Sequence, residues 1–397
     1  EAAGVIGGAA GAAPPGRGPG ARILAVDVGA GTADILLTLP SGPLENAVKL
    51  VVPSRTQVVA AEIRQATRLG QTVVFTGPTM GGGADGAAMK AHLRAGHAFV
   101  ACEEAALTFA DDLDKVRALG ARVVGDGAAA ELLERLPAEQ VAAVRSGDLD
   151  PGGLRRALEL LGAATRFDAV AVAVQDHGFN PHGSNRVLRF ALWEAAVRES
   201  RRIGELFYAA ADVPVQATRL RAAATLAAEL ADGAPVLAAD TGPAALYGAL
   251  PPGAGDAVLV NVGNGHTICV VALGGRLAGV FEHHTAALDG PGLEQRLRRF
   301  LAGELGSEEV REDGGHGAVL AQPVPGGLPL IATGPRRGLL AGSRLPLEFA
   351  APYGDMMLSG CFGLLRAFAE RGVGESPGAA ATPPEAEAGA APVEAVG

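Results

Sequence analysis

One pattern of residues occurs twice in this chain, at 23–31 and again at 257–265. Each copy is an aliphatic run interrupted by Asp or Asn, followed by a Gly-x-Gly pair and a second strand-like run. Further along, the strand-like segment 73–78, which ends in Thr-Gly-Pro, has a similar counterpart at 330–335. Two motifs that recur in the same order predict two halves of like topology. With 57 glycines in the chain, a single Gly-x-Gly match would be weak evidence.

Strand-like and helix-like segments alternate between the two copies. The aliphatic runs 22–28 and 35–39 flank a glycine-rich tip, which predicts a β-hairpin. Residues 54–69 follow a proline, carry apolar residues on one side and end at a glycine, as expected of a helix. A buried strand is predicted at 72–75. The pattern as a whole predicts an α/β protein.

Composition excludes several classes of protein. The chain has 397 residues and a formal net charge of −10, which argues against nucleic acid as the main partner. A hydrophobic fraction of 48% excludes a wholly disordered chain, and the length suggests two domains at about 150 residues each. No apolar run approaches the roughly 18 residues that span a bilayer, so we expect a soluble chain without a membrane partner.

The two ends of the chain differ from its middle. Residues 1–20 and 375–397 are rich in Ala, Gly and Pro, so we expect both to be disordered tails. The first of them lacks the basic start and apolar centre of a secretion signal. The three cysteines are scattered along the sequence, which favours reduced thiols and a cytoplasmic location. We expect a first half at 21–230, which contains a helical insertion, and a second half at 231–374.

The first glycine-rich tip has the components of a phosphate site. Glycines at a hairpin tip can adopt positive φ and point backbone N–H groups outward as a nest for an anionic phosphate. Asp27, at the end of the preceding strand, can hold Mg²⁺ through water. The segment Asp27-x-Gly29-x-Gly31-Thr32-x-Asp34 supplies these components in one turn. A bare hairpin turn is an equally good interpretation of this segment by itself.

The order of the motifs resembles that of the actin, Hsp70 and sugar-kinase ATPase superfamily. Residues 27–34 match its first phosphate motif, 261–267 its second and 330–335 its adenosine motif, and 240–248 is similar to its connecting helix. The resemblance implies a two-lobed actin-like ATPase fold, which is ribonuclease H-like, with duplicated halves around a cleft for ATP and Mg²⁺. It covers 21–40 and 235–370.

The same resemblance assigns candidate contacts to the nucleotide. They are Gly29, Gly31, Thr32, Asn261, Gly263, Gly265, Thr333 and Gly334. Asp240 and Thr241 would lie near the γ-phosphate, where a carboxylate can orient or deprotonate an attacking water or hydroxyl. An N-cap of the following helix is an equal alternative for Asp240.

Asn261 departs from the superfamily pattern. ATP-hydrolysing members usually have Asp at this position, and an amide brings no negative charge to Mg²⁺. Hydrolysis would therefore be slow or would depend on Asp27 and Asp240.

Three further sequence segments resemble a single family within this superfamily. Residues 174–178, 282–285 and 353–357 are similar to the DUF1786 family, some of whose members carry the name pyruvate formate-lyase activating enzyme. A radical-SAM activator needs Cys-x-x-x-Cys-x-x-Cys to hold three irons of a cluster, and the cysteines here lie far apart in sequence. The narrower family therefore implies no reaction.

Five of the eight histidines lie in three groups, two of which include a nearby carboxylate. The groups are Asp176, His177 and His182; His283 and His284; and Asp313 and His316. Asp176 and His177 follow the β-type run 167–174, so we expect them at the carboxyl end of a strand, where open α/β sheets place ligands.

These histidines allow three interpretations. Imidazole and carboxylate together can bind a transition metal or relay protons. Asp176 and His177 are therefore candidate catalytic residues, together with Asp27 and Asp240, and His283 and His284 are candidate ligands of a second metal ion. No group has a ready-made metal spacing, so polar loop histidines, or substrate binding without a metal, are the alternatives.

Two functions from different classes fit these observations. The first is an ATP-dependent phosphotransferase or ATPase that closes over Mg-ATP and acts on a small polar substrate held by the 176–186 loop, where Arg186 can clamp an anion. The second is a nucleotide-dependent switch or assembly protein with little turnover, which Asn261 favours. A homo-oligomer is compatible with either.

Overall fold

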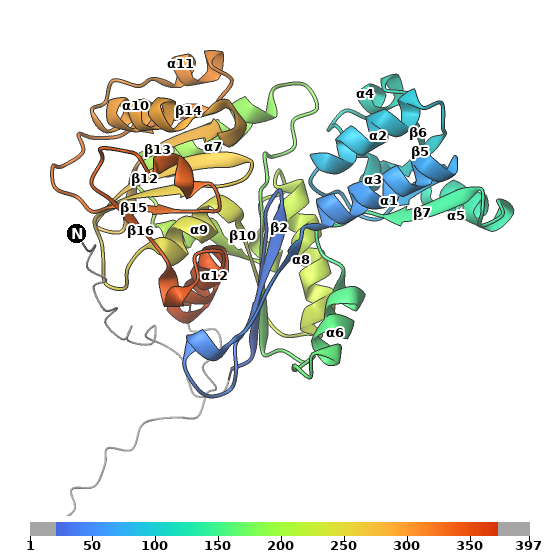
Figure 1. Ribbon diagram of the computed structural model, residues 1–397, viewed down its shortest axis with the longest axis horizontal. Helices are drawn as coiled ribbons and strands as arrows, with labels where there is room; N and C mark the ends of the chain where they lie inside the picture. The colour runs from blue at the N-terminus through green and yellow to red at the C-terminus, as the bar shows by residue number, and fades with distance from the viewer. Residues whose placement is uncertain (1–20, 372–397) are drawn as a thin grey trace, which may run out of the picture.

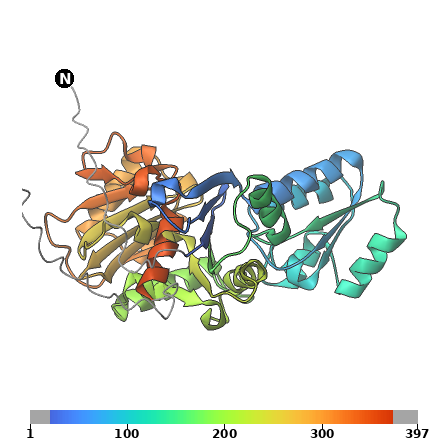
Figure 2. The same cartoon turned by 90° about the horizontal axis from the view of Figure 1, so that it is seen from below.

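The computed structural model describes residues 21–371, so the predicted disordered tails at 1–20 and 375–397 lie outside the described residues. Two lobes, each built on a six-stranded sheet, lie side by side, and a smaller unit projects from the first lobe (Figures 1 and 2). Within the described range, no helix combines the length and apolarity that crossing a membrane requires.

The sheet of the first lobe begins with an antiparallel meander. β1 (Ile23–Val28), β2 (Thr32–Leu37) and β3 (Val48–Pro53) pair in the order in which they occur in the sequence, so the predicted hairpin is confirmed. β8 (Ala169–Val174) and β10 (Val236–Asp240) extend the sheet in parallel on the other side of β1, and the short β9 (Phe207–Ala209) ends it. β1 and β8 are buried on both faces, as central strands covered by helices must be.

The second lobe repeats this arrangement. β11 (Ala257–Val262), β12 (His266–Leu273) and β13 (Arg276–His284) form the antiparallel meander. β15 (Leu330–Thr333) and β16 (Leu347–Phe349) add in parallel beside β11, and β14 (Gly317–Leu320) pairs with β13 at the far edge. The duplicated strand order confirms the predicted two-lobed, ribonuclease H-like α/β fold.

The second repeat proposed from the sequence, 73–78 with 330–335, is wrong as a structural correspondence. β15 pairs in parallel with β11, and the strand that pairs in parallel with β1 is β8. β4 (Thr72–Thr76) belongs to a separate sheet. The two segments look alike because any buried strand that ends in a glycine turn has this composition, whereas strand partners are set by long-range packing.

The insertion in the first lobe is an α/β unit, not the helical insertion that we expected. Four parallel strands form its sheet in the order β6-β5-β4-β7. The strands besides β4 are β5 (Phe99–Cys102), β6 (Arg122–Val124) and β7 (Val141–Arg145), and the helices are α1 (Arg55–Leu69), α2 (Ala84–Arg94), α3 (Glu103–Ala106), α4 (Leu113–Ala118) and α5 (Asp126–Arg135). Short strands such as β6 are only partly buried, so their alternation with helices is weak in the sequence.

The remaining helices cover or join the two large sheets. They are α6 (Pro151–Leu160), α7 (Asn185–Arg198), α8 (Thr218–Ala231), α9 (Thr241–Ala249), α10 (Gly290–Leu301), α11 (Ser307–Glu312) and α12 (Ser359–Glu370). β10 pairs with β8, so the division at residues 230/231 is too early and the first half extends through β10. The predicted connecting helix at 240–248 is α9.

Helices α9 and α12 cross between the lobes with almost no side chain between them. A Cβ at Gly248 would overlap the carbonyl oxygen of Ser359, and one at Gly363 would overlap the carbonyl oxygen of Ala244. The backbones of the two helices therefore touch.

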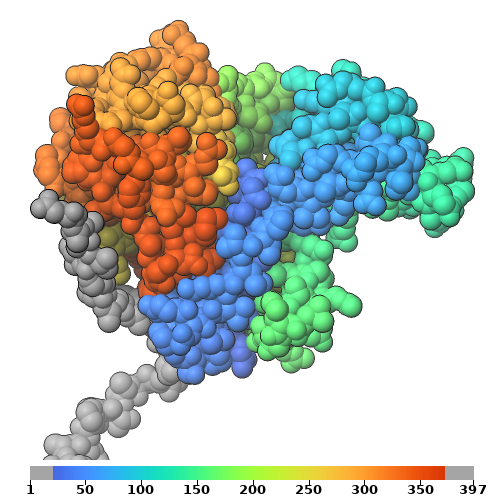
Figure 3. Space-filling model, viewed as in Figure 1, coloured from blue at the N-terminus to red at the C-terminus, as the bar shows by residue number. Residues whose placement is uncertain are grey.

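Residues 21–371 contain four buried apolar clusters, one on the outer face of each large sheet and two others that differ in extent. One continuous buried cluster joins β1, β8 and β10 through α9 and α12 to β11 and β12. The inserted unit has a cluster of its own, which includes Phe75 and Phe99. In the space-filling view the inserted unit (blue and cyan) stands away from the second lobe (orange), with the green segment between them (Figure 3).

Candidate functional site

The tips of the β1–β2 and β11–β12 hairpins have the same local structure and meet between the lobes. In each tip the first glycine donates its N–H to a carbonyl three residues on, from Gly29 to Thr32 over 2.8 Å and from Gly263 to His266 over 2.9 Å. A Cβ at Gly31 would lie 2.9 Å from Nδ2 of Asn264. The sequence repeat therefore encodes two equivalent turns that touch.

The prediction that the tip glycines adopt positive φ is wrong. None of the four tip glycines, all within the described part of the chain, has φ in the left-handed region, so they do not form the nest proposed from the sequence. Space is the constraint at Gly31 and Gly263, since a Cβ at Gly263 would lie 2.8 Å from the carbonyl oxygen of His266, whereas a Cβ at Gly29 or Gly265 would meet nothing closer than 3.4 Å. Gly334, in contrast, has φ of 97°, and its Cβ would lie 2.5 Å from Oδ1 of Asn261.

A small cavity of about 80 Å³ lies between the tips. Its lining includes most of the predicted nucleotide contacts, namely Gly29, Thr32, Asn261, Gly263, Gly265, Thr333 and Gly334, with Asp27 and Thr241 beside them. Gly31 is not among the described residues of this lining. A space of this size holds only a few water molecules, so we expect the tips to move apart when a nucleotide binds.

Asp27 and Asp34 place two carboxyl groups at this cavity with few partners. Thr241 donates its hydroxyl to Oδ1 of Asp27 over 2.6 Å, whereas Oδ1 of Asp34 is buried without a hydrogen-bond partner among residues 21–371. Burial, reinforced by Asp34, raises the pKa of Asp27 to about 8, and burial raises the pKa of Asp34 to about 7. Two poorly partnered carboxylates beside space for water fit a hydrated Mg²⁺.

This pair leads to a pH prediction. Without a cation, these two groups are expected to lower the free energy of unfolding as the pH rises above about 4, by up to about 1.4 kcal/mol per pH unit for each group, and the fall levels off above about pH 7 for Asp34 and about pH 8 for Asp27. The sign follows because the folded-state pKa values lie above the ordinary value of 3.8, so the folded state holds protons that the unfolded chain has already released. Urea unfolding at several pH values measures the slope.

Asp27→Asn should flatten this slope, as should millimolar Mg²⁺ in the wild type, because each removes or neutralises the buried charge. Asp212→Asn, which changes an exposed carboxylate, is the matched control and should keep the wild-type slope. Parallel profiles for wild type and Asp27→Asn would contradict the assignment of the raised pKa to this pair.

Asp240 lies at the N-terminus of α9 rather than in the cavity. Its carboxylate accepts hydrogen bonds from the backbone N–H of Gly242 and of Asp176, each over 2.9 Å, so the N-cap alternative is confirmed. The guanidinium of Arg189 also contacts it at 2.7 Å. Asp240 is not among the described residues that line the cavity, and Thr241 is the side chain of this pair that reaches it.

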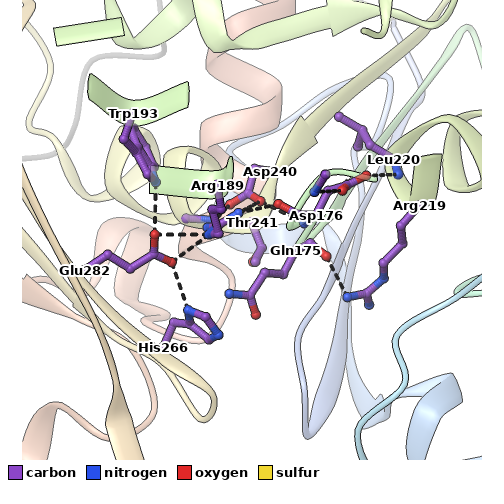
Figure 4. A network of polar contacts seen from close by, with 12 residues as sticks. Gln175, Asp176, Arg189, Trp193, Arg219, Leu220, Asp240, Thr241, His266 and Glu282 are labelled. Carbon is purple, nitrogen blue, oxygen red and sulfur yellow. Dashed lines mark hydrogen bonds and ion pairs between the residues drawn. The ribbon is translucent and has the colours of Figure 1, made fainter. Parts of the chain in front are cut away.

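Arg189 is the centre of a buried polar network that the sequence did not reveal (Figure 4). It pairs with Asp240 and, at 2.8 Å, with Glu282, which is fully buried. Glu282 also accepts hydrogen bonds from the indole of Trp193 at 3.1 Å and lies 2.8 Å from Nδ1 of His266. Although burial opposes ionisation, Arg189 and His266 hold the pKa of Glu282 well below its usual value.

The network connects the lobes, because Arg189 on α7 pairs both with Asp240, which ends β10 of the first lobe, and with Glu282 on β13 of the second. Arg189 and Trp193 are four residues apart, on one face of a helix that is otherwise apolar there. An arginine on an otherwise apolar helix face was the sequence signal that could have indicated a buried ion pair.

The predicted pair His283–His284 is split by strand alternation. His283 faces Asp313, with Nε2 at 3.4 Å from its carboxylate, which also pairs with Arg296. The ring of His284 lies on the opposite face, 4.6 Å from that of His266 between centroids. The two side chains therefore do not bind one ion together.

A larger cavity of about 510 Å³ lies on the far side of the hairpin tips, against the inserted unit. Its wall is formed by the glycine-rich segment 81–83, by Arg219, by the 175–178 turn with His177, and by His266 and His284. The predicted 176–186 loop supplies one wall of this cavity through residues 176–178. The inserted unit supplies another wall, and no sequence motif had indicated that it would lie here.

Asp176 serves to hold this wall in shape. Its carboxylate accepts hydrogen bonds from the N–H of Gly178 at 2.6 Å and of Leu220 at 2.8 Å (Figure 4). Arg219 pairs with Asp148 through two contacts of 2.8 Å and donates to the carbonyl of Gln175. Arg186 donates to the carbonyl of Gly314 at 2.9 Å, away from this wall.

Comparisons with known proteins agree with part of this description. The family profile described as "Putative pyruvate format-lyase activating enzyme (DUF1786)" matches residues 80–339. No curated protein matches the chain.

Two solved structures show partial similarity. Ethanolamine utilization protein EutJ from Carboxydothermus hydrogenoformans is 12% identical, with 87% of this chain and 89% of that chain covered and a TM-score of 0.32. A chain of the PilM-PilN type IV pilus biogenesis complex is 18% identical, with 57% and 87% covered and a TM-score of 0.30. With TM-scores this low, the fold assignment rests on the strand order of the two sheets.

Proposed function

This chain belongs to the DUF1786 family, and we propose that it is an ATP-dependent enzyme that transfers or hydrolyses the terminal phosphoryl group of Mg-ATP bound between the two hairpin tips. The family description names an activating enzyme, and the cysteines of this chain are not arranged to bind the iron–sulfur cluster that such an enzyme needs. Cys102, Cys269 and Cys361 are all buried, in the inserted unit, in β12 and in α12 respectively. They cannot converge on one iron–sulfur cluster.

One observation carries the proposal. Two equivalent glycine turns, one from each lobe, converge with the carboxyl groups of Asp27 and Asp34 on a single cavity. The tip N–H groups other than those of Gly29 and Gly263, which bond within their turns, can bind phosphate oxygens, and the carboxylates can hold the hydrated Mg²⁺ that neutralises them. Thr333, at the end of β15, hydrogen-bonds Ser359 at 2.9 Å and fixes the strand end where the adenosine would lie.

The position of the larger cavity supports transfer to a small molecule. Ala30, Gln175, Gly265 and His266 border both cavities, so a γ-phosphate between the tips would face the larger one across a thin wall. His177 lies on that wall, and burial lowers its pKa to about 2, so its imidazole is neutral. A neutral imidazole of such low basicity is a weak general base, but it can accept a hydrogen bond from a substrate hydroxyl and so position it.

A switch with little turnover is the second candidate, and the closed tips favour it. The cavity must enlarge before a nucleotide binds, and Asn261 supplies no carboxylate to the ion. ATP turnover that rises with a small polar substrate supports the enzyme. ATP binding with negligible turnover under all substrates supports the switch.

Nucleotide binding itself is the first experiment. Mg-ATP at 100 times its Kd is expected to stabilise the folded protein by about 2.7 kcal/mol, because it binds only the folded state. Asp27→Ala should reduce this shift when magnesium is present, and Asp212→Ala, at an exposed site, should leave it unchanged. Differential scanning fluorimetry reports the shift. If neither ATP nor ADP stabilises the wild type at millimolar concentration, the proposal fails.

A further inference from the structure

Three imidazoles from distant parts of the sequence converge beside the hairpin tips. One ligand nitrogen each from His177, His266 and His316 lies within 4.8 Å of the other two. The ring centroids of His177 and His316 are 5.6 Å apart and those of His266 and His316 are 4.7 Å apart. The sequence had placed His177 and His316 in different groups and had not selected His266.

His316 lacks the partners that a buried imidazole requires. It is fully buried, and neither of its ring nitrogens has a hydrogen-bond partner within residues 21–371. Since a buried polar group without a partner costs free energy, a ligand or water at this position would stabilise the fold.

His266 is oriented by a carboxylate in the manner of a metal ligand. Its Nδ1 lies 2.8 Å from Oε1 of Glu282, which leaves Nε2 for the centre of the cluster. Glu282 is held in turn by Arg189 and Trp193. Carboxylates that bond the outer nitrogen of a ligating histidine fix its ring orientation and raise its basicity.

The local charge also favours a cation. The buried network behind His266 contains one guanidinium, on Arg189, and two carboxylates, on Glu282 and Asp240. The excess negative charge lies in a region of low dielectric, where it attracts a cation more strongly than it would in water.

From these four observations we propose that His177, His266 and His316 bind one divalent transition-metal ion, with zinc the best match, at the edge of the larger cavity. Three neutral imidazoles with a free fourth position are the ligand set of catalytic zinc sites. Nitrogens bound to one zinc ion at about 2.1 Å lie roughly 3.4 Å apart, so each ring has to move by about 1 Å.

The free position of this ion faces the cavity lined by His177 and His266. A bound water or an oxygen of the substrate can occupy it. His177 follows β8 of the first lobe, and the other two ligands lie on or beside strands of the second, so the ion also joins the lobes.

Metal analysis of untagged protein tests this site without any nucleotide, so its outcome is separate from that of the proposed ATP binding. Protein purified from zinc-supplemented cells should contain about one zinc per chain by plasma mass spectrometry. Replacement with Co²⁺ should give the visible absorption bands of a four-coordinate site. His316→Ala and His177→Gln should each lower the zinc content below about a tenth of an equivalent.

His182→Ala is the matched control, because His182 is an exposed histidine on the same loop as His177. It should keep the full zinc content. Glu282→Gln should weaken zinc affinity by about 10- to 100-fold in competition with a chelator, as a positioning residue would. Circular dichroism shows which variants are folded, and His177→Gln, at a half-buried position, keeps the test valid if His316→Ala does not fold.

Two results would overturn the site. Folded wild type that binds no Zn²⁺ and no Co²⁺ at about 10 µM free metal would do so, because zinc sites of this kind bind far more tightly. Zinc that stays at the wild-type level in the folded His177→Gln variant would also do so, since the ion would then lie elsewhere.

Discussion

Replacement of Arg189 with methionine is expected to lower the free energy of unfolding by about 3–5 kcal/mol, because it leaves buried carboxylates without their cation. Glu282 is fully buried and Asp240 is largely buried, and both contact the guanidinium within 3.1 Å. Methionine keeps much of the side-chain volume, so loss of charge is the main change. Guanidinium unfolding followed by circular dichroism measures the difference.

Arg186→Met is the matched control, because Arg186 lies on the same helix but is exposed and donates only to backbone carbonyls of the 314–315 turn. It should cost less than about 1 kcal/mol. Adding Glu282→Met to Arg189→Met should recover part of the lost stability, since the uncompensated charge is then removed. Equal effects of the two single arginine replacements would contradict the role given to Arg189.

Gly248→Ala is expected to destabilise the protein by about 3 kcal/mol through overpacking where α9 and α12 cross. The added methyl group would overlap the carbonyl of Ser359 and lie 2.7 Å from the N–H nitrogen of Gly363. Backbone atoms cannot rotate out of the way, so the helices must separate. Because a Cβ at Gly360 would already overlap the carboxylate of Asp27, such a shift also reaches the candidate magnesium site.

Gly127→Ala provides the comparison, because Gly127 lies in α5 with open space where the methyl group would go. There alanine should be neutral or should stabilise by up to about 1 kcal/mol, since it restricts the unfolded chain. Chemical unfolding of the two variants separates crowding from the general effect of removing a glycine. A Gly248→Ala protein as stable as wild type would show that the crossing has room to adjust.

Local patterns in the sequence were enough to predict the two hairpins and their equivalence. The strand, glycine and strand order at 23–31 and 257–265 is short-range information, and each copy forms the same turn in the structure. The helix at 55–69 was predicted for the same reason, since apolar spacing and a final glycine are local signals.

Long-range pairing could not be predicted in this way. The strand at 72–76 was recognised, but its partners are β5 and β7, which the motifs did not connect to it. The same limit applies to the histidines. His266 belongs to the second hairpin tip, and only the fold brings its ring within reach of His177 and His316.

The alternation of side chains along a strand explains why the predicted pair His283 and His284 is separated. His283 and His284 are adjacent in sequence, and adjacent residues of a strand point to opposite faces. A correct prediction of the strand through residue 284 would have separated them.

The continuous core that joins the two large sheets determines how the protein unfolds. Because α9 and α12 are buried against both sheets, neither lobe has a complete apolar interior without the other. The two lobes therefore form one cooperative unit, although the sequence displays them as two repeats. The inserted unit has its own interior and can open independently. In native-state hydrogen exchange, the boundary between slowly and rapidly exchanging amides thus lies where the insertion leaves β3 and returns to α6.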